Sequence, residues 1–444
     1  MSHCAKGFAN VPVLLNLVYL LLLVLAAPWI LWRRWRQGKR LGGFYAKCTG
    51  SILLQATTSP GRRIWLHAVS VGEVLLLKPV LEKLQQQYPH DTLYLSVTTV
   101  TGREVAEKTY PSLNIVWFPF DFSWAVRRAL NLIQPDLMIL AELELWPNFI
   151  REAHRRSIPI VVINGRISEK SFRGYLRLRG LMSSLLRRID RFAVQEALHA
   201  ERLQKLGMPG ERISVTGSIK YDGVNLDQRH PRILELRQGL GLGEDSLVWV
   251  VGSTQAPEEA WALDIFQKLK AQFPKLHLIL VPRHQERFDE VARLMEARPF
   301  PSQRRSQLPA NKPPAAVTLV DTLGELKYIW GLAHVGFVGG SFNERGGQNM
   351  IEPAAYGVAV TFGPNTWNFQ HTVQALLQHQ AAIMVPSKED WAAVTERLLQ
   401  DPFERAELGQ RAADFVASQQ GATRKTMDLL AQYLKQPARQ QQAA

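Results

Sequence analysis

The sequence predicts an α/β protein with two similar halves, each a parallel sheet covered by helices. From residue 60 onward, short runs rich in β-branched and apolar residues alternate with longer helical patterns, which is typical of strands joined by helical crossovers. This alternation breaks over residues 221–241 and then resumes. The 444 residues also suit two to three domains at about 150 residues each.

The predicted strands fall into one group before the break and one group after it. The first group is Ile64–Val69, Leu93–Val97, Leu137–Ala141, Ile160–Ile163, Phe192–Val194 and Ile213–Val215. The second group is Leu247–Val251, Leu276–Val281, Val317–Val320, Val335–Val338, Val358–Phe362 and Ile383–Val385. Ligands of open α/β sheets bind beyond the carboxyl ends of the strands. We therefore expect a cleft between two facing halves, lined by the loops that follow strands.

An uncharged apolar run, Val11–Trp32, precedes the first predicted strand and is long enough to cross a bilayer as a helix. Its positive charges follow it, in residues 33–40, whereas a cleaved signal peptide carries them in front. This order predicts an uncleaved anchor with the body on the cytoplasmic side. Because Pro12, Asn16 and Pro28 interrupt the run, a helix that lies in the membrane interface, or a buried helix, is the alternative.

Composition excludes several classes of protein. Hydrophobic residues make up 46% and charged residues 21%, which is globular rather than disordered or fibrous. The two cysteines, Cys4 and Cys48, fit neither a disulfide framework nor a zinc site, and they indicate a reducing compartment. The net charge of +14 predicts an anionic partner, which is nucleic acid, a membrane surface or a phosphorylated substrate. Residues 151–220 alone hold 15 Lys and Arg against 6 Asp and Glu, which suits an anionic lipid headgroup.

Carboxylates follow two of the predicted strands in the first half. Glu73 lies in the first turn of a helix after Ser70-Val71-Gly72, where it either caps the helix or acts as a general base in the cleft. Glu142 and Glu144 follow the strand Leu137–Ala141, so one carboxylate can face a substrate while the other binds backbone or an arginine. Lys220, which follows the last strand, is either a surface lysine or a group that stabilises negative charge on a phosphate.

The second half has its densest group of polar and glycine residues after the strand Val335–Val338. Glycines there expose backbone N–H groups before a helix start, which predicts anion binding, although the pattern is neither a Walker loop nor a dinucleotide fingerprint. Asn349 and Glu352 share one helix face and form either a ribose-binding pair or a capping pair. Arg283, after another strand, suits bidentate contact with phosphate, and we expect the neighbouring His284 to be structural.

Six motifs in this order closely resemble those of the 3-deoxy-D-manno-octulosonic acid (Kdo) transferases of Gram-negative lipopolysaccharide biosynthesis. They lie at His67–Glu73, Glu142–Asn148, Thr216–Asp222, Pro282–His284, Asp321–Leu326 and Arg345–Glu352. The resemblance spans nearly the whole chain. It implies a GT-B glycosyltransferase with two Rossmann-like domains facing a cleft. The domains implied are an anchor with its basic flank (1–40), an acceptor domain (41–222), a linker (223–241), a donor domain (242–435) and a flexible tail (436–444).

The resemblance also implies the reaction and its site residues. Kdo would pass with inversion from CMP-Kdo to the lipid A precursor (lipid IVA) at the inner membrane, without a metal or another cofactor and without nucleic acid as a partner. Glu73 matches the family's general base, and Glu142 and Lys220 match residues that support the transition state. The matches to CMP-binding positions are Pro282, Arg283, Leu323, Gly324, Glu325, Asn349, Met350, Ile351 and Glu352. Gln348 departs from the histidine usual in the family, which puts any contact of an imidazole there in doubt.

Two other functions remain open on the residues alone. A GT-B transferase with another donor, such as a UDP-sugar, would use the same two-domain cleft, and competition by CMP against UDP separates the two. A membrane-tethered protein that binds polyanions would explain the pI of about 9.8. Binding of nucleic acid would weaken steeply with salt, and the paired Glu142 and Glu144 argue against it.

Overall fold

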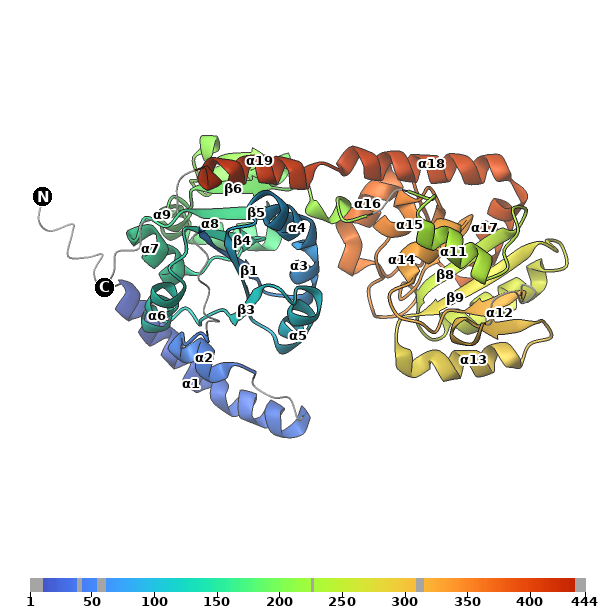
Figure 1. Ribbon diagram of the computed structural model, residues 1–444, viewed down its shortest axis with the longest axis horizontal. Coiled ribbons are helices and arrows are strands. Elements are labelled where there is room, and N and C mark those ends of the chain that lie inside the picture. The colour runs from blue at the N-terminus through green and yellow to red at the C-terminus, as the bar shows by residue number, and fades with distance from the viewer. Residues whose placement is uncertain (1–10, 38–41, 54–60, 225–226, 309–314, 436–444) are drawn as a thin grey trace, which may run out of the picture. The chain divides into compact units, whose positions relative to one another are not determined.

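The chain forms two compact α/β units (Figure 1). The computed structural model describes residues 11–37, 42–53, 61–224, 227–308 and 315–435. The first unit contains the chain up to Gly223 together with the segment from Gln420 onward, and the second unit contains Val224–Gln419. The predicted tail, Cys4 and the basic side chains of residues 33–40 lie outside the described parts of the chain.

The first unit is built on a seven-stranded parallel sheet with the order β3-β2-β1-β4-β5-β6-β7. Its strands are β1 (Arg63–Ala68), β2 (Thr92–Val97), β3 (Asn114–Trp117), β4 (Leu137–Ala141), β5 (Ile160–Gly165), β6 (Arg191–Val194) and β7 (Ile213–Val215). β1 pairs with β2 on one side and with β4 on the other, so the strand order reverses beside β1. This is the point at which open α/β sheets bind their ligands.

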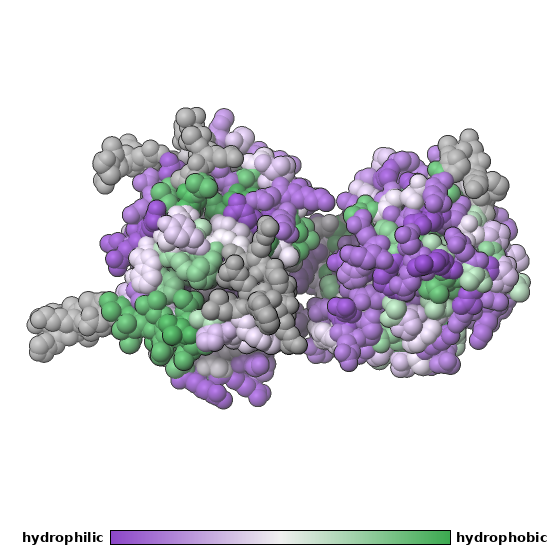
Figure 2. Space-filling model, turned by 90° about the horizontal axis from the view of Figure 1, so that it is seen from below, coloured by the Kyte–Doolittle hydropathy of each residue, from purple (hydrophilic) through white to green (hydrophobic). Residues whose placement is uncertain are grey.

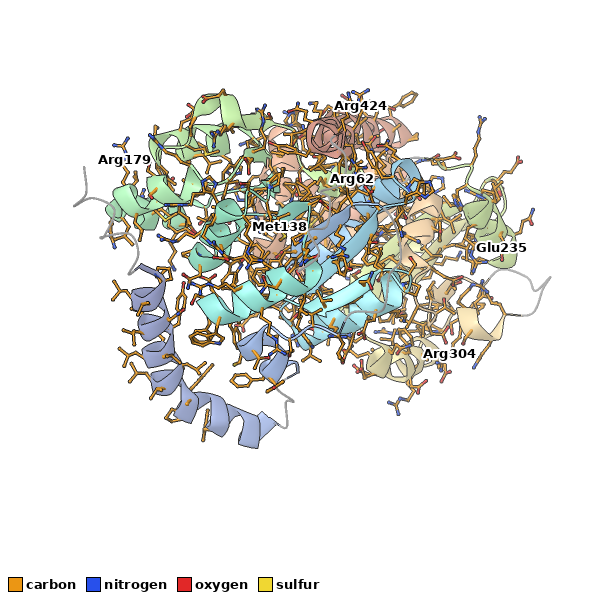
Figure 3. The ribbon with its side chains drawn as sticks, turned by 60° about the vertical axis from the view of Figure 1, so that its left-hand side comes forward. Arg62, Met138, Arg179, Glu235, Arg304 and Arg424 are labelled. Carbon is orange, nitrogen blue, oxygen red and sulfur yellow. The ribbon has the colours of Figure 1, made fainter. Side chains whose placement is uncertain are left out.

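Helices cover both faces of this sheet because successive strand residues point to opposite faces. Leu66 and Ile139 lie in one core with α4, and Trp65 and Leu140 lie in the other with α6 and α7. In Figure 3, Met138 lies inside the unit, whereas Arg179 projects from its surface at the start of α9. The helices up to residue 205 are α1 (Val11–Gln37), α2 (Phe44–Thr49), α3 (Val71–Leu76), α4 (Lys78–Gln87), α5 (Val100–Thr109), α6 (Ser123–Ile133), α7 (Pro147–Arg155), α8 (Glu169–Arg177), α9 (Arg179–Leu186) and α10 (Ala197–Lys205).

The C-terminal helix α19 (Ala422–Leu434) belongs to the first unit, although the predicted donor domain extended to residue 435. Its apolar side chains, among them Met427 and Leu430, join the core that contains α4. The Asp222 carboxylate accepts hydrogen bonds from the backbone N–H groups of Gly421 (2.7 Å) and Thr423 at the start of the helix. The chain therefore crosses between the units twice, which the alternation of strands and helices does not reveal.

The second unit repeats the architecture with the parallel order β10-β11-β9-β8-β12-β13-β14. Its strands are β8 (Leu247–Thr254), β9 (Leu276–Pro282), β10 (Ser302–Arg304), β11 (Val317–Leu319), β12 (Val335–Val338), β13 (Ala359–Phe362) and β14 (Ile383–Met384). Its helices are α11 (Pro231–Gly239), α12 (Glu258–Leu269), α13 (Phe288–Glu296), α14 (Leu326–Ile329), α15 (Ile351–Ala355), α16 (Gln370–Gln378), α17 (Lys388–Gln400) and α18 (Pro402–Gln419). The predicted linker at 223–241 contains α11, which contacts α14.

The apolar helix α1 is long and apolar enough to cross a membrane over Pro12–Trp29, and it also contacts the first unit along one side. The Asn16 side chain hydrogen-bonds Ser123 through both its amide nitrogen (2.8 Å) and its oxygen (3.0 Å), and the Tyr19 hydroxyl donates to Asp121 (3.0 Å). The opposite side exposes leucines and valines, and Figure 2 shows the hydrophobic patch over this helix. The predicted interruption at Asn16 is thus the point where the helix binds the unit.

Candidate active site

The first group of predicted residues lies at the carboxyl edge of the first sheet, beginning with the turn between β1 and α3. Ser70 caps α3, and its hydroxyl oxygen accepts a hydrogen bond from the Glu73 N–H (3.3 Å). The Glu73 carboxylate accepts in return from the Val69 N–H (2.8 Å) and from the Ser70 hydroxyl (3.0 Å). These contacts are a variant of the capping box, in which Glu73 binds the N–H of the residue before the cap instead of that of Ser70. The capping function expected of Glu73 is therefore present.

Capping leaves the Glu73 carboxylate able to accept a proton. Each of its oxygens accepts one of these two hydrogen bonds, whereas a carboxylate has about four lone-pair sites. Burial raises the pKa of Glu73 above its ordinary value, against the effect of the two hydrogen bonds, and the charge of Glu142 raises it further. A carboxylate with a raised pKa at a strand end is suited to general base catalysis.

The exit from β4 supplies the second group. Glu142 has a φ of 58°, a left-handed conformation that ends the strand, so the alternation considered for Glu142 and Glu144 does not continue. Its carboxylate accepts a hydrogen bond from Arg166 (3.1 Å), which follows β5. Burial, and then the charges of Glu73 and Glu142, raise the pKa of Glu144 to about 7. Of the two acids, Glu142 is therefore the one that binds an arginine.

Lys220 lies in a single turn of 3₁₀ helix after β7 and completes the cluster. Partial desolvation of its ammonium group lowers the pKa of Lys220, the positive charge of Arg166 lowers it further, and Glu142 and Glu73 oppose the shift. The Ile219 N–H in the same turn donates to the side chain of Asn164 (3.1 Å), a buried residue at the end of β5. The structure thus brings Glu73, Glu142 and Lys220 together, and Asn164 is a supporting residue that sequence reasoning missed.

In the second unit, the glycine-rich loop after β12 is held by a buried carboxylate. Glu258, at the start of α12, accepts four hydrogen bonds from backbone N–H groups. The donors are Gln255 (2.9 Å), Gly340 (2.8 Å), Ser341 (3.0 Å) and Phe342 (3.1 Å). The loop was predicted to bind an external anion through its N–H groups, but for these residues the anion is Glu258 of the chain itself. Glycine is required at Gly339, because a Cβ there would lie 2.7 Å from the Glu258 carboxylate.

Asn349 and Glu352 form a capping pair at the start of α15. The Asn349 side chain accepts from the Ile351 N–H (3.1 Å) and donates to the Glu352 carboxylate (3.1 Å). Burial raises the pKa of Glu352, while Asn349 and the charges of Lys327 and Arg283 oppose the rise. Arg283, which follows β9, is thus one of the charges that act on Glu352. The capping contacts are present, and ribose binding by this pair stays a prediction.

The remaining predicted donor residues divide by exposure. Pro282, Met350 and Ile351 are buried, whereas Leu323 and Gly324 are exposed on a turn in which Gly324 has a φ of 81°. The Glu325 carboxylate binds Arg232, Arg305 and the Thr322 hydroxyl, so it is used in contacts within the unit. Within the described residues, no group of three His, Cys, Asp or Glu side chains lies close enough to hold a metal ion.

Comparison with known proteins identifies the family. Residues 36–223 match the family model described as 3-deoxy-D-manno-octulosonic-acid transferase (kdotransferase). The 3-deoxy-D-manno-octulosonic acid transferase of Haemophilus influenzae is 35% identical over 86% of this chain and 89% of its own, and that of Bordetella pertussis is 33% identical over 94% and 99%. The chain belongs to the Kdo transferase family. It is therefore a glycosyltransferase of lipopolysaccharide biosynthesis, as the six motifs indicated.

A solved structure with a similar fold covers most of this chain. A UDP-N-acetylglucosamine 2-epimerase from Listeria monocytogenes is similar with a TM-score of 0.55 and 13% identity, over 85% of this chain and 99% of its own. The C-terminal CMP-Kdo binding domain of WaaA from Acinetobacter baumannii matches with 32% identity and a TM-score of 0.40, over 42% of this chain and 96% of that domain. The two parallel sheets of seven strands confirm the predicted fold class.

Proposed function

We propose that this Kdo transferase moves Kdo from CMP-Kdo to the lipid A precursor lipid IVA, with inversion and with Glu73 as the general base. The observation that carries the proposal is the cluster at the carboxyl edge of the first sheet, in which Glu73 has a raised pKa beside Glu142, Arg166 and Lys220. Membership of the family indicates that the transferred sugar is Kdo. The CMP donor and the lipid acceptor are inferred from the resemblance of the motifs.

Inversion needs a single attack on the anomeric carbon from the face opposite the phosphate. An acceptor hydroxyl forms the new C–O bond while the bond to the CMP phosphate breaks, and the hydroxyl proton passes to Glu73. CMP leaves as a stable anion, so protonation of the leaving group is less important than stabilisation of its charge. Lys220 and Arg166 supply positive charge in the first unit, and Arg283 and Lys327 supply it near Glu352 in the second. The proposed chemistry needs no metal ion.

We further propose that α1 holds the enzyme at the cytoplasmic face of the inner membrane. Its exposed apolar side supports contact with lipid, and the positive residues after the apolar run favour the cytoplasmic side. Because Asn16 and Tyr19 attach the opposite side to the first unit, the contacts favour the interfacial alternative over a freely crossing helix.

Mass spectrometry of lipid IVA after incubation with purified enzyme and CMP-Kdo tests the reaction. Wild type should add one or more Kdo units, and Glu73→Gln should add none while it still binds CMP and unfolds at a temperature close to that of wild type. Glu82→Gln, at an exposed position on α4, is the matched control and should transfer normally. Normal turnover by Glu73→Gln would exclude Glu73 as the base. Inhibition of Kdo transfer by added UDP, rather than by added CMP, would favour another nucleotide-sugar donor.

A further inference from the structure

A basic cavity lies in the first unit, outside the carboxylate cluster. It has a volume of about 360 Å³ and lies between the start of α1, helices α6 and α7, and the segment after α9. Four arginines line it, Arg127, Arg151, Arg155 and Arg188, together with a single carboxylate, Glu152. Neither Glu73 nor any predicted donor residue contributes to it.

Glu152 cannot neutralise these arginines. Its carboxylate already accepts hydrogen bonds from Arg155 (2.7 and 3.1 Å) and from the neighbouring Arg156 (2.9 Å), and Arg127 lies 3.8 Å from it. One negative charge is therefore shared by three guanidinium groups before Arg151 and Arg188 are considered. The lining keeps an excess of positive charge, which favours an anionic ligand.

Arg188 is held at the wall of the cavity near a second positive charge, Arg151. Its guanidinium donates from one nitrogen to the backbone oxygen and the hydroxyl of Ser184, which fixes the side chain at the wall of the cavity. Burial lowers the pKa of Arg188, and the positive charge of Arg151 lowers it further. Like charges held this close are stabilised by an anion between them, and guanidinium groups suit the planar contacts of a phosphate.

The position of α1 determines where the anion comes from. Pro12, in the first turn of α1, forms part of the cavity wall, and Asn148 of the lining hydrogen-bonds Asn16 of the same helix (3.3 Å). The side of α1 that faces away from the unit exposes Leu14, Leu17 and other apolar side chains. Figure 3 shows this helix running beside the rest of the first unit. A helix of this kind buries its apolar side at the boundary between headgroups and acyl chains, so the cavity beside it lies at headgroup level.

The N-terminus of α7 does not explain the cavity. The N–H groups of Asn148 and Phe149 at that end donate to Asp121 (2.9 and 2.8 Å), so a residue of the chain already caps it. The positive charge that lines the cavity therefore comes from arginine side chains and not from the helix end.

We propose that this cavity binds the phosphate of an anionic phospholipid headgroup at the membrane surface. The ligand is a lipid of the membrane and not the acceptor that receives Kdo. The contact would fix the rotation of α1 and the first unit on the membrane, because it adds a second point of attachment beside the apolar side of the helix.

Binding of the full-length enzyme to vesicles tests the proposal. Vesicles of phosphatidylcholine alone are compared with vesicles of equal parts phosphatidylcholine and phosphatidylglycerol. The variant Arg127→Gln/Arg188→Gln removes cations from two walls of the cavity. It should lose affinity for the anionic vesicles by about fivefold for each cation removed, with little change on the neutral ones. The control Arg397→Gln/Arg411→Gln removes the same charge from α17 and α18, and it should bind both vesicles as wild type does.

Three results would overturn the proposal. Equal losses in the two double variants would mean that net charge, and not the cavity, attracts the lipid. Stabilisation of wild type by inorganic phosphate, without any preference for anionic vesicles, would mean that the site takes free phosphate. If Arg127→Gln/Arg188→Gln had a higher KM than wild type for lipid IVA in neutral detergent micelles, the cavity would bind the acceptor and not a membrane lipid. If the double variant melts far below wild type, Arg127→Gln alone replaces it, because that side chain is 57% exposed.

Discussion

Glu144 is a carboxyl group surrounded by other carboxylates. It follows β4, and burial together with the charges of Glu73 and Glu142 raises its pKa to about 7, against an ordinary value of 4.5. At neutral pH a substantial fraction of Glu144 is therefore protonated. A protonated Glu144 removes one negative charge from the cluster, which favours the ionised form of Glu73 that a base requires.

Glu144→Gln should make the stability of the enzyme less dependent on pH. The folded-state pKa is raised, so the stability that the protonated group contributes is present below pH 4.5 and lost as the pH rises through about 7. The glutamine variant stays neutral at every pH. As the pH rises from 4.5 to about 7, the free energy of unfolding of Glu144→Gln should increase relative to that of wild type by about 1 to 3 kcal/mol. The upper value applies if solvent does not screen the charge of Glu144 in the wild type. Thermal melts of both proteins over a pH series measure the difference.

The exposed carboxylate of Glu82 provides the control for this series. Its side chain is 54% exposed on α4, and Glu82→Gln should give a pH series parallel to that of wild type. If the pH series of Glu144→Gln also ran parallel to that of wild type, Glu144 would be ionised in the folded enzyme at neutral pH. The proposal that protonated Glu144 favours the ionised form of Glu73 would then be wrong.

The strand-end acids could be located from the sequence, but not all of their contacts could. Glu73 and Glu142 follow apolar strands, and that local pattern is enough to predict them. The motif predicts that Glu325 contacts CMP, but its ion pairs with Arg232 and Arg305 could not be predicted, because Arg232 comes from the predicted linker. Glu258 resembles an ordinary acid in a first helical turn, and only contacts with residues about eighty positions later give it a role.

At the scale of elements, the link between α12 and the loop after β12 depends on Glu258. This carboxylate is fully buried and receives four backbone hydrogen bonds, so it fixes the loop that leads to Asn349 and Glu352. Burial raises its pKa, and the four N–H groups oppose the rise. The second unit thus uses its own carboxylate to shape the glycine-rich segment.

Glu258→Gln should destabilise the second unit by about 3 kcal/mol or more. The amide retains one acceptor oxygen and places its NH₂ group against backbone donors, so buried N–H groups lose their partners. The affinity for CMP should fall as well, because the loop loses its support. Denaturant unfolding and CMP titration measure the two effects.

Glu389→Gln is the matched control, since Glu389 is an exposed acid in the first turn of α17. It should leave both the unfolding midpoint and the CMP affinity unchanged. A wild-type midpoint for Glu258→Gln would mean that the loop keeps its conformation without the carboxylate.

Most elements follow from periodicity, and the exceptions have physical reasons. The twelve predicted apolar runs all contain strands, and the structure adds two edge strands that were not predicted, β3 and β10. β3 is a short apolar run (Asn-Ile-Val-Trp) that the prediction missed, whereas β10, with the sequence Ser-Gln-Arg, has no apolar signal. The predicted linker lacks a sustained apolar run, but Ile233 and Leu236 are buried once α11 packs on the second unit. Three-dimensional partners, and not local sequence, determine these segments.

At the scale of the whole molecule, the first unit is formed from two separate stretches of the chain. The first unit is completed only by α19, which follows the entire second unit in sequence. The resemblance places this helix in the donor domain (242–435). The apolar side of α19 instead joins the core with α4.

Leu430→Ala should therefore weaken the first unit and leave the second unit unchanged. Leu430 is fully buried in the core that contains α4, and truncation of such a leucine costs about 2 to 5 kcal/mol. Leu398→Ala removes an equally buried leucine from the core of the second unit and is the reciprocal variant. Hydrogen exchange of the full chain reports both units: Leu430→Ala should speed exchange in β1, β2 and α4, and Leu398→Ala in β8, β9 and α12. CMP affinity should fall only for Leu398→Ala, if CMP binds the second unit as proposed. Faster exchange of the β8 and β9 amides in Leu430→Ala would show that the units unfold together, and α19 would then support the whole molecule rather than the first unit.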